Sequence, residues 1–105
     1  MTAFELLNTL PAAIDPQATA GLDRVLQFNI SQPAYVSIRD GACEVTTGTD
    51  EAADLTLTLS DDDLVSLLTG KLDGMTAAMS GRLKLKGDLA LAQQLNRYFD
   101  FRRLT

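Results

Sequence analysis

The sequence predicts a small α+β protein made of a single domain that spans residues 1–105. Two kinds of hydrophobic pattern predict this fold class. In some segments apolar and polar residues alternate, as in strands with one buried face, and in others apolar residues recur every three or four positions, as in amphipathic helices. The length of 105 residues is close to the commonest domain size, and the 46% hydrophobic content is sufficient for a core without metals or disulfides.

The N-terminal segment is expected to be helical. Phe4, Leu7 and Leu10 have helical spacing, and Pro11 ends the pattern. Residues 16–20 are expected to add a turn of helix, with an aspartate as its N-cap and a glycine at its end.

Four of the following segments have the alternation that is typical of strands with one apolar face: residues 22–31, 35–39, 43–47 and 54–60. Asp40 and Gly41 lie between the second and the third of them, and this pair predicts a tight hairpin because both residue types accept positive φ angles. The alternation is clearest in the last segment, where Leu55, Leu57 and Leu59 share one side. One side of the predicted sheet is therefore apolar and needs to be covered by helices.

The second half of the chain is expected to supply that cover. Ser60 is the predicted N-cap of a helix that ends at the next glycine, and residues 73–80 form a shorter helix. Residues 82–86 are the fifth predicted strand, with leucines on one side. Asp88 caps the last predicted helix, over residues 88–99, whose apolar side chains recur at helical spacing.

Charge and residue types exclude several classes of function. The net charge is −5 at pH 7 and the pI is about 4.4, which opposes binding to nucleic acid. The sequence has no histidine, the usual general base and commonest metal ligand, and we expect neither a metal nor a cofactor. The single cysteine, Cys43, cannot form an intramolecular disulfide, and we interpret it as a small apolar side chain because no activating partner is in sight.

Two charged clusters are candidates for ion binding. The aspartates at 61–63 have the spacing of a helix start rather than that of a calcium loop. Arg82, Lys84 and Lys86 line one face of a predicted strand and could contact a phosphate or a headgroup, although a solvated sheet face is the favoured interpretation. No nucleophile has a base beside it and no phosphate-loop motif is present, so we predict no catalytic residue.

The ends of the chain and its apolar runs bear on cellular location. The longest apolar runs are only a few residues, so no transmembrane helix is expected. The N-terminus lacks the basic segment and the long apolar stretch of a secretory signal, and residues 101–105 are not a peroxisomal address. These observations predict a cytoplasmic protein.

The order and spacing of motifs in the second half are specific. An Asp-led strand at 54–60 is followed by an acidic helix start, by the pair Gly70 and Lys71, and by the segment GRLKLKGD at 81–88. This arrangement resembles the sterol carrier protein-2 family of lipid-binding domains, and the resemblance extends over about residues 21–99. It implies a mainly antiparallel five-stranded sheet covered by helices on one face. It also implies an apolar tunnel that takes up fatty acids, acyl-CoAs, phospholipids or sterols.

The resemblance and the apolar pattern together select candidate residues for the lining of this tunnel. They come from the predicted sheet, from the short helix and from the last helix: Leu26, Phe28, Ile30, Val36, Ile38, Met75, Met79, Leu91, Leu95 and Phe99. Methionines suit a pocket that must fit chains of varied shape. The alternative is that these side chains only pack on one another. The pattern alone favours this alternative, whereas the resemblance favours a tunnel.

We expect the protein to bind, and to transfer inside the cell, a hydrophobic lipid ligand without covalent chemistry of its own. The alternative is an accessory domain that uses the same apolar groove for protein association or dimerisation, with Phe99 and Phe101 packed on a partner. The expected partners are an apolar small molecule and no nucleic acid, while transient membrane contact and a homodimer stay open. An enzyme is disfavoured because it would need a cofactor or metal that the sequence does not indicate.

Overall fold

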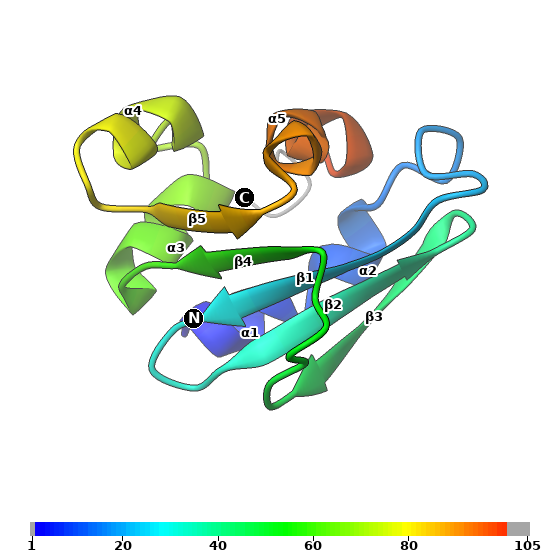
Figure 1. The fold of residues 1–105 in the computed structure, drawn as a ribbon, viewed down its shortest axis with the longest axis horizontal. Helices are drawn as coiled ribbons and strands as arrows, with labels where there is room; N and C mark the ends of the chain where they lie inside the picture. Colours follow the sequence, from blue (N-terminus) through cyan, green and yellow to red (C-terminus); the bar gives the residue numbers. More distant parts are fainter. Residues whose placement is uncertain (1, 101–105) are drawn as a thin grey trace.

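The structure, a computed structural model, describes residues 2–100 (Figure 1). Among these residues, no helix combines the length and the apolar character that are needed to cross a bilayer. The position of Phe101, which was predicted to contact a partner, lies outside the described residues. The helices and strands occur along the chain in this order: α1 (Ala3–Leu7), α2 (Leu10–Ala13), β1 (Asp23–Asn29), β2 (Ala34–Arg39), β3 (Ala42–Thr47), β4 (Leu55–Thr58), α3 (Asp61–Leu68), α4 (Gly74–Met79), β5 (Lys84–Gly87) and α5 (Leu89–Tyr98).

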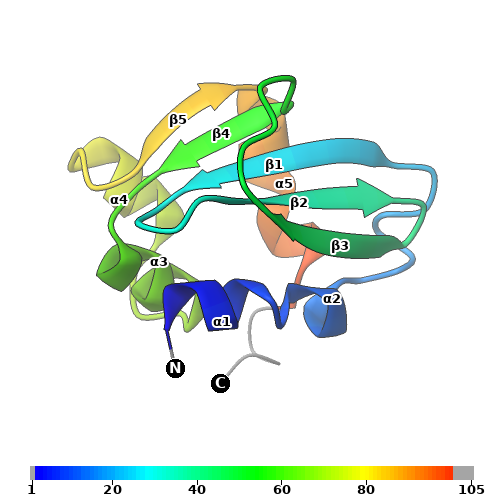
Figure 2. The same ribbon diagram turned by 90° about the horizontal axis from the view of Figure 1, so that it is seen from below.

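Within residues 2–100 the five strands form one sheet in the order β3-β2-β1-β4-β5. All neighbouring strands are antiparallel except β1 and β4, which are parallel. The helices lie on one face of the twisted sheet, whereas the loop that joins β3 to β4 crosses the other face (Figure 2). The predicted α+β class with a mainly antiparallel five-stranded sheet is confirmed.

The hydrophobic core fills the space between the sheet and the helices. Alternate side chains of β1, β2 and β4 point into it, and α1, α2, α3 and α5 supply the opposite layer. The short helix α4 contributes least, since Ala77 is the buried residue among its six described positions. The largest fully buried apolar side chains include Leu7, Leu10, Leu26, Ile38, Leu55, Leu57, Leu64 and Val36.

Short-range signals in the sequence predicted several of the element boundaries. Asp40 and Gly41 form the β2–β3 turn with φ angles of 46° and 85°, as expected for a two-residue hairpin. The side chains of Ser60 and Asp88 accept hydrogen bonds from the backbone amides three residues further on, at 3.1 Å and 3.2 Å. These two caps begin α3 and α5 as predicted.

The N-terminal segment differs from the prediction. α1 ends at Leu7, and Pro11 lies inside the first turn of a second helix, α2, instead of ending the first. A proline is tolerated there because the first backbone N–H groups of a helix have no intrahelical acceptor. Residues 16–20 form a turn rather than a helix. The carboxylate of Asp15 still caps this turn by accepting from the amide of Gln17 at 2.9 Å, but the segment is too short to propagate a helix.

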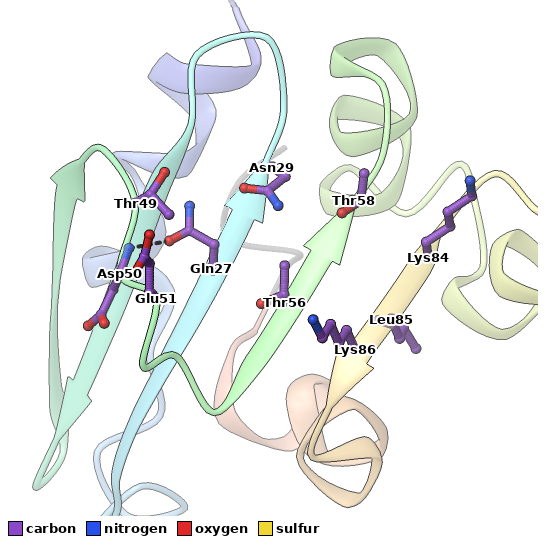
Figure 3. A pocket seen from close by; sticks show the side chains of 10 residues that line it. All are labelled: Gln27, Asn29, Thr49, Asp50, Glu51, Thr56, Thr58, Lys84, Leu85 and Lys86. Carbon is purple, nitrogen blue, oxygen red and sulfur yellow. Dashed lines mark hydrogen bonds between the residues drawn. The ribbon is translucent and has the colours of Figure 1, made fainter.

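Gln27 is a polar side chain buried on the face of the sheet that carries no helices. Its exposed fraction is 1%, although its position in the alternating pattern of β1 predicts a solvated residue. Nε2 donates to the carbonyl oxygen of Gly48 at 3.1 Å, and Oε1 accepts from the amide of Asp50 at 2.7 Å. These bonds attach the β3–β4 loop to the strand that it crosses (Figure 3).

The variant Gln27→Leu is expected to lower the free energy of unfolding by about 2–4 kcal/mol. The Asp50 amide and the Gly48 carbonyl would lose their partner at a partly buried site. Urea denaturation of both proteins checks this. Gln32→Leu, at an exposed position of the β1–β2 loop, is the matched control and should change stability by less than about 0.5 kcal/mol. Equal effects of the two substitutions would contradict the role of Gln27.

A second prediction concerns the close approach between Gly87 and the start of β4. A Cβ atom at Gly87 would lie 2.4 Å from the carbonyl oxygen of Asp54, so alanine does not fit without a backbone shift. Gly48 has a similar φ, 118° against 111° for Gly87, but nothing within 4 Å of its Cβ position. Thermal melts should therefore show a loss for Gly87→Ala that exceeds the loss for Gly48→Ala by about 1 kcal/mol or more. Similar melting temperatures for the two variants would refute this steric constraint.

Candidate binding site

An apolar groove lies over the β4–β5 part of the sheet, between α4 and α5. Its volume is about 530 Å³, which is within the range of small-molecule pockets. Leu57 and Leu85, which are paired directly across β4 and β5, contribute to its lining from the sheet. The complete lining comes from both strands, from the α3–α4 segment, from the α4–β5 loop and from α5: Leu57, Leu67, Gly70, Leu72, Asp73, Gly74, Met75, Ala78, Leu83, Leu85, Ala92, Gln93 and Leu95.

Polar side chains in this groove are few. The carboxylate of Asp73 is engaged as the N-cap of α4, where it accepts from the amide and the hydroxyl of Thr76 at 3.0 Å and 3.2 Å. Gln93 is an exposed amide on α5. Among residues 2–100, no three histidine, cysteine, aspartate or glutamate side chains are grouped so that they could hold a metal ion. The groove offers mainly apolar surface to an occupant.

The structure places the ten predicted tunnel residues in three environments. Met75 and Leu95 line the groove. Met79 is 83% exposed and does not belong to the lining. Contact of these residues with a ligand stays a prediction. The other seven are buried in the hydrophobic core: Leu26, Phe28, Ile30, Val36, Ile38, Leu91 and Phe99.

Most residues of the groove were absent from the predicted set, for an identifiable reason. That set drew on β1 and β2, whose apolar side chains are buried in the core. Leu57, Leu83 and Leu85 line the groove instead, and they belong to the alternating leucines that the sequence pattern does reveal. The pattern does not reveal that β4 and β5 lie side by side beneath α4 and α5, which cover them incompletely.

A second pocket, of about 490 Å³, lies on the opposite face of the sheet (Figure 3). Two cross-strand pairs form one side of it, Thr56 with Lys86 and Thr58 with Lys84. Its lining is largely polar and carries both signs of charge, so it does not suit a hydrocarbon chain. The full lining combines residues of β1, β4 and β5 with the β3–β4 loop: Gln27, Asn29, Thr49, Asp50, Glu51, Thr56, Thr58, Lys84, Leu85 and Lys86.

The basic residues of the segment 82–86 do not form one cluster. Arg82 pairs with Asp63 at the start of α3, with its Nε donating to Oδ1 at 3.1 Å. The hydrogen bond from the guanidinium lowers the pKa of the Asp63 carboxyl, and Asp63 in turn raises the pKa of Arg82. Lys84 and Lys86 point to the open face of the sheet (Figure 3) and form no ion pair with the described residues.

Comparison with known proteins identifies the family. A sequence model of the SCP-2 sterol transfer family matches residues 4–100. The match covers nearly the whole chain, and the protein belongs to this family. Sterol carrier protein 2 from Bos taurus is 40% identical over 60 residues, which are 57% of this chain and 11% of that protein. Hydroxysteroid dehydrogenase-like protein 2 from Danio rerio is 30% identical over 98 residues, which are 89% of this chain and 24% of that protein.

Solved structures have the same fold. Sterol carrier protein 2 like 2 from Aedes aegypti superposes with a TM-score of 0.72 at 24% identity, over 89% of both chains. The sec-alkylsulfatase Pisa1 from Pseudomonas sp. superposes with a TM-score of 0.78 at 26% identity, over 86% of this chain and 15% of that one. The chain thus spans a small part of several longer relatives, about a tenth of the bovine protein and a quarter of the zebrafish one.

Cys43 is a half-buried thiol on β3, away from the groove lining. Burial raises its pKa to about 11 from an ordinary value of 9.0, because the thiolate is poorly solvated there. The thiolate, which is the reactive form, is therefore scarce at neutral pH.

Alkylation of Cys43 by iodoacetamide at neutral pH should accordingly be about a hundredfold slower than that of an unperturbed thiol, as the difference in pKa implies. Mass spectrometry after timed labelling measures the rate. The same protein in concentrated urea is the control, because unfolding restores solvation of the thiol. A native protein that reacts as fast as the unfolded chain would contradict this assignment.

Proposed function

We propose that the apolar groove between α4 and α5 holds the hydrocarbon part of a lipid, and that the protein carries such ligands without changing them chemically. The observation that carries the proposal is the largely aliphatic lining of a pocket of about 530 Å³. Membership of the SCP-2 sterol transfer family supports the same function. The location that we propose is the cytoplasm.

The free energy of burial is sufficient for useful affinity without a charged anchor. Each methylene group moved from water into an apolar site contributes about 0.8 kcal/mol. About fifteen methylenes would supply roughly 12 kcal/mol before the loss of ligand and protein freedom, and micromolar affinity needs about 8 kcal/mol net. Because this contribution does not depend on direction, we expect weak selectivity for chain length and for the detailed shape of the chain.

The polar residues of the groove support binding rather than catalysis. Asp73 is the acidic side chain of the lining, and its carboxylate is already occupied by the amide and hydroxyl of Thr76. A general acid or base needs to reach a proton of the substrate, which an engaged cap does poorly. Gln93 offers an amide that can bond to a polar group of a ligand at the edge of the groove.

A second candidate function is an accessory domain that receives an apolar segment of a protein in the same groove. The observation that favours it is that two relatives, the dehydrogenase-like protein and the alkylsulfatase, are much longer than the part that matches this chain. Phe99, which was predicted to contact such a partner, is 2% exposed and packs in the core of this chain. A partner would therefore meet the groove lining rather than this phenylalanine.

Filling the groove should weaken lipid binding. In Ala92→Phe a phenyl ring would project from α5 into the groove, and we expect the affinity for a fluorescent fatty acid to fall by about tenfold or more. Titration, followed by displacement with unlabelled fatty acid, measures the affinity. Thermal melts of the same samples verify that Ala92→Phe remains folded.

Ala90→Phe is the matched control for this experiment. Ala90 is exposed on the same helix and does not line the groove, so its substitution should leave binding unchanged. Equal binding by the two variants would place the ligand elsewhere. If the wild-type protein takes up no fatty acid but binds a second protein that Ala92→Phe excludes, the accessory-domain function is favoured.

A further inference from the structure

The polar pocket on the face of the sheet without helices has a regular arrangement of functional groups. Three neighbouring strands, β1, β4 and β5, each contribute two polar side chains to it, and the strand registers align these side chains in two rows. Because neighbouring strands are about 4.8 Å apart, each row spans about 10 Å. Each row runs from an amide through a hydroxyl to an ammonium: Gln27, Thr56 and Lys86 in one, Asn29, Thr58 and Lys84 in the other.

The β3–β4 loop forms the acidic end of the pocket. It lies over β1, because Gln27 accepts from the Asp50 amide at 2.7 Å and donates to the Gly48 carbonyl at 3.1 Å. The Asp50 carboxylate in turn accepts from the amide of Ala52 at 2.9 Å, which shapes the turn that carries Glu51. These bonds fix the backbone on both sides of Glu51, so the acidic wall is in place without a ligand.

The charges at the two ends of the pocket are available to a ligand. Lys84, Lys86 and Glu51 are exposed and form no ion pair within residues 2–100. The two lysines lie two positions apart on one face of β5, so they repel one another, and an anion between them would remove that repulsion. Figure 3 shows them on one side of the pocket and the acidic loop on the other, with the amides and hydroxyls between.

We propose that this pocket binds a small soluble molecule with a phosphate monoester at one end and an ammonium group at the other. The phosphate lies between Lys84 and Lys86, because its charge of about −1.5 to −2 and its three acceptor oxygens match two ammonium groups. The ammonium pairs with Glu51, while Thr56 and Asn29 bond to the polar body of the ligand. Since an ion pair takes up about 2.8 Å at each end of a 10 Å row, ligand charges about 4–5 Å apart fit.

A molecule with both charges fits this pocket better than a simple ion. Glu51 repels a second anion and the lysines repel a cation, so only a ligand with opposite charges at its two ends is attracted throughout. A phosphodiester, as in a phospholipid headgroup, carries a single negative charge and leaves one lysine uncompensated. The sheet separates this pocket from the apolar groove, and the inference therefore does not depend on the proposed function.

Titration of the isotope-labelled full chain with phosphoethanolamine, followed by NMR, tests the proposal. Amide chemical shifts should change in residues 49–51, 56–58 and 84–86, and those of α4 should stay constant. Inorganic phosphate and ethanolamine should each bind about fivefold more weakly, because each forms ion pairs at one end only. Glycerophosphoethanolamine, a phosphodiester, should also bind more weakly, which distinguishes a soluble monoester from a lipid headgroup.

Substitutions at the two ends should have different effects. Lys84→Gln and Lys86→Gln should each weaken phosphoethanolamine binding by about threefold to fivefold, the loss of one partly exposed ion pair. Glu51→Gln should weaken phosphoethanolamine binding without weakening that of inorganic phosphate, because it removes the partner of the ammonium and a charge that repels the anion. Lys71→Gln and Glu44→Gln, at exposed positions outside the lining, are the matched controls and should change neither affinity.

Three results would overturn the inference. One is a set of shifts centred outside the pocket, or none at all. Another is phosphoethanolamine binding no tighter than that of inorganic phosphate. The third is an equal loss for Lys71→Gln and Lys84→Gln, which would show that only net charge matters. A wild-type protein that binds phosphoethanolamine as expected but takes up no fatty acid would refute the proposed function and support this inference.

Discussion

The parallel pairing of β1 with β4 is the constraint on which the site depends, and Asp54 holds it from several directions. Its carboxylate accepts from the amide of Val25 at 2.8 Å, and its own amide donates to the Val25 carbonyl at 2.9 Å. Its carbonyl oxygen accepts from the amide of Asp88 at 2.8 Å. One residue thereby joins the central strand, the start of β4 and the turn into α5. The sheet and the helix that bound the groove are positioned by the same few bonds.

Local regularities of the sequence were enough to predict most elements, because alternation and caps act over a few residues. Asp40 and Gly41 predicted the β2–β3 turn, and Asp88 predicted the start of α5. The sequence predicted an apolar site but not its position, because that position depends on contacts between residues far apart in the chain, such as Val25 with Asp54, which are 29 residues apart. Gln27 shows the same limit, because its polar character predicts solvent while a distant loop buries it.

The difference between core and groove lies in what the helices bring to the sheet. α1 contributes Leu6 and Leu7 to the core, and α3 adds Leu64 and Leu68. These four leucines are at most 3% exposed, as expected for a close-packed interior. Over β5 the groove is lined by small residues of the facing helices, Gly74, Ala78 and Ala92, so Leu85 is only half-buried, whereas Leu57 beside it on β4 is fully buried. A pocket here follows from missing volume rather than from any special shape of the sheet.

The six-residue helix α4 has a consequence for the range of molecules that the protein can accommodate. It is anchored by the small side chain of Ala77, whereas its neighbour α3 is held by two leucines. Displacing α4 therefore exposes little apolar area and costs little free energy. Because α4 carries Met75 and Ala78, a small outward shift would widen the pocket while the leucines of β4 and β5 stay in place. We therefore expect the α4 wall of the pocket to move outward more easily than the wall made by β4 and β5, so that the pocket volume would adapt to the width of an occupant.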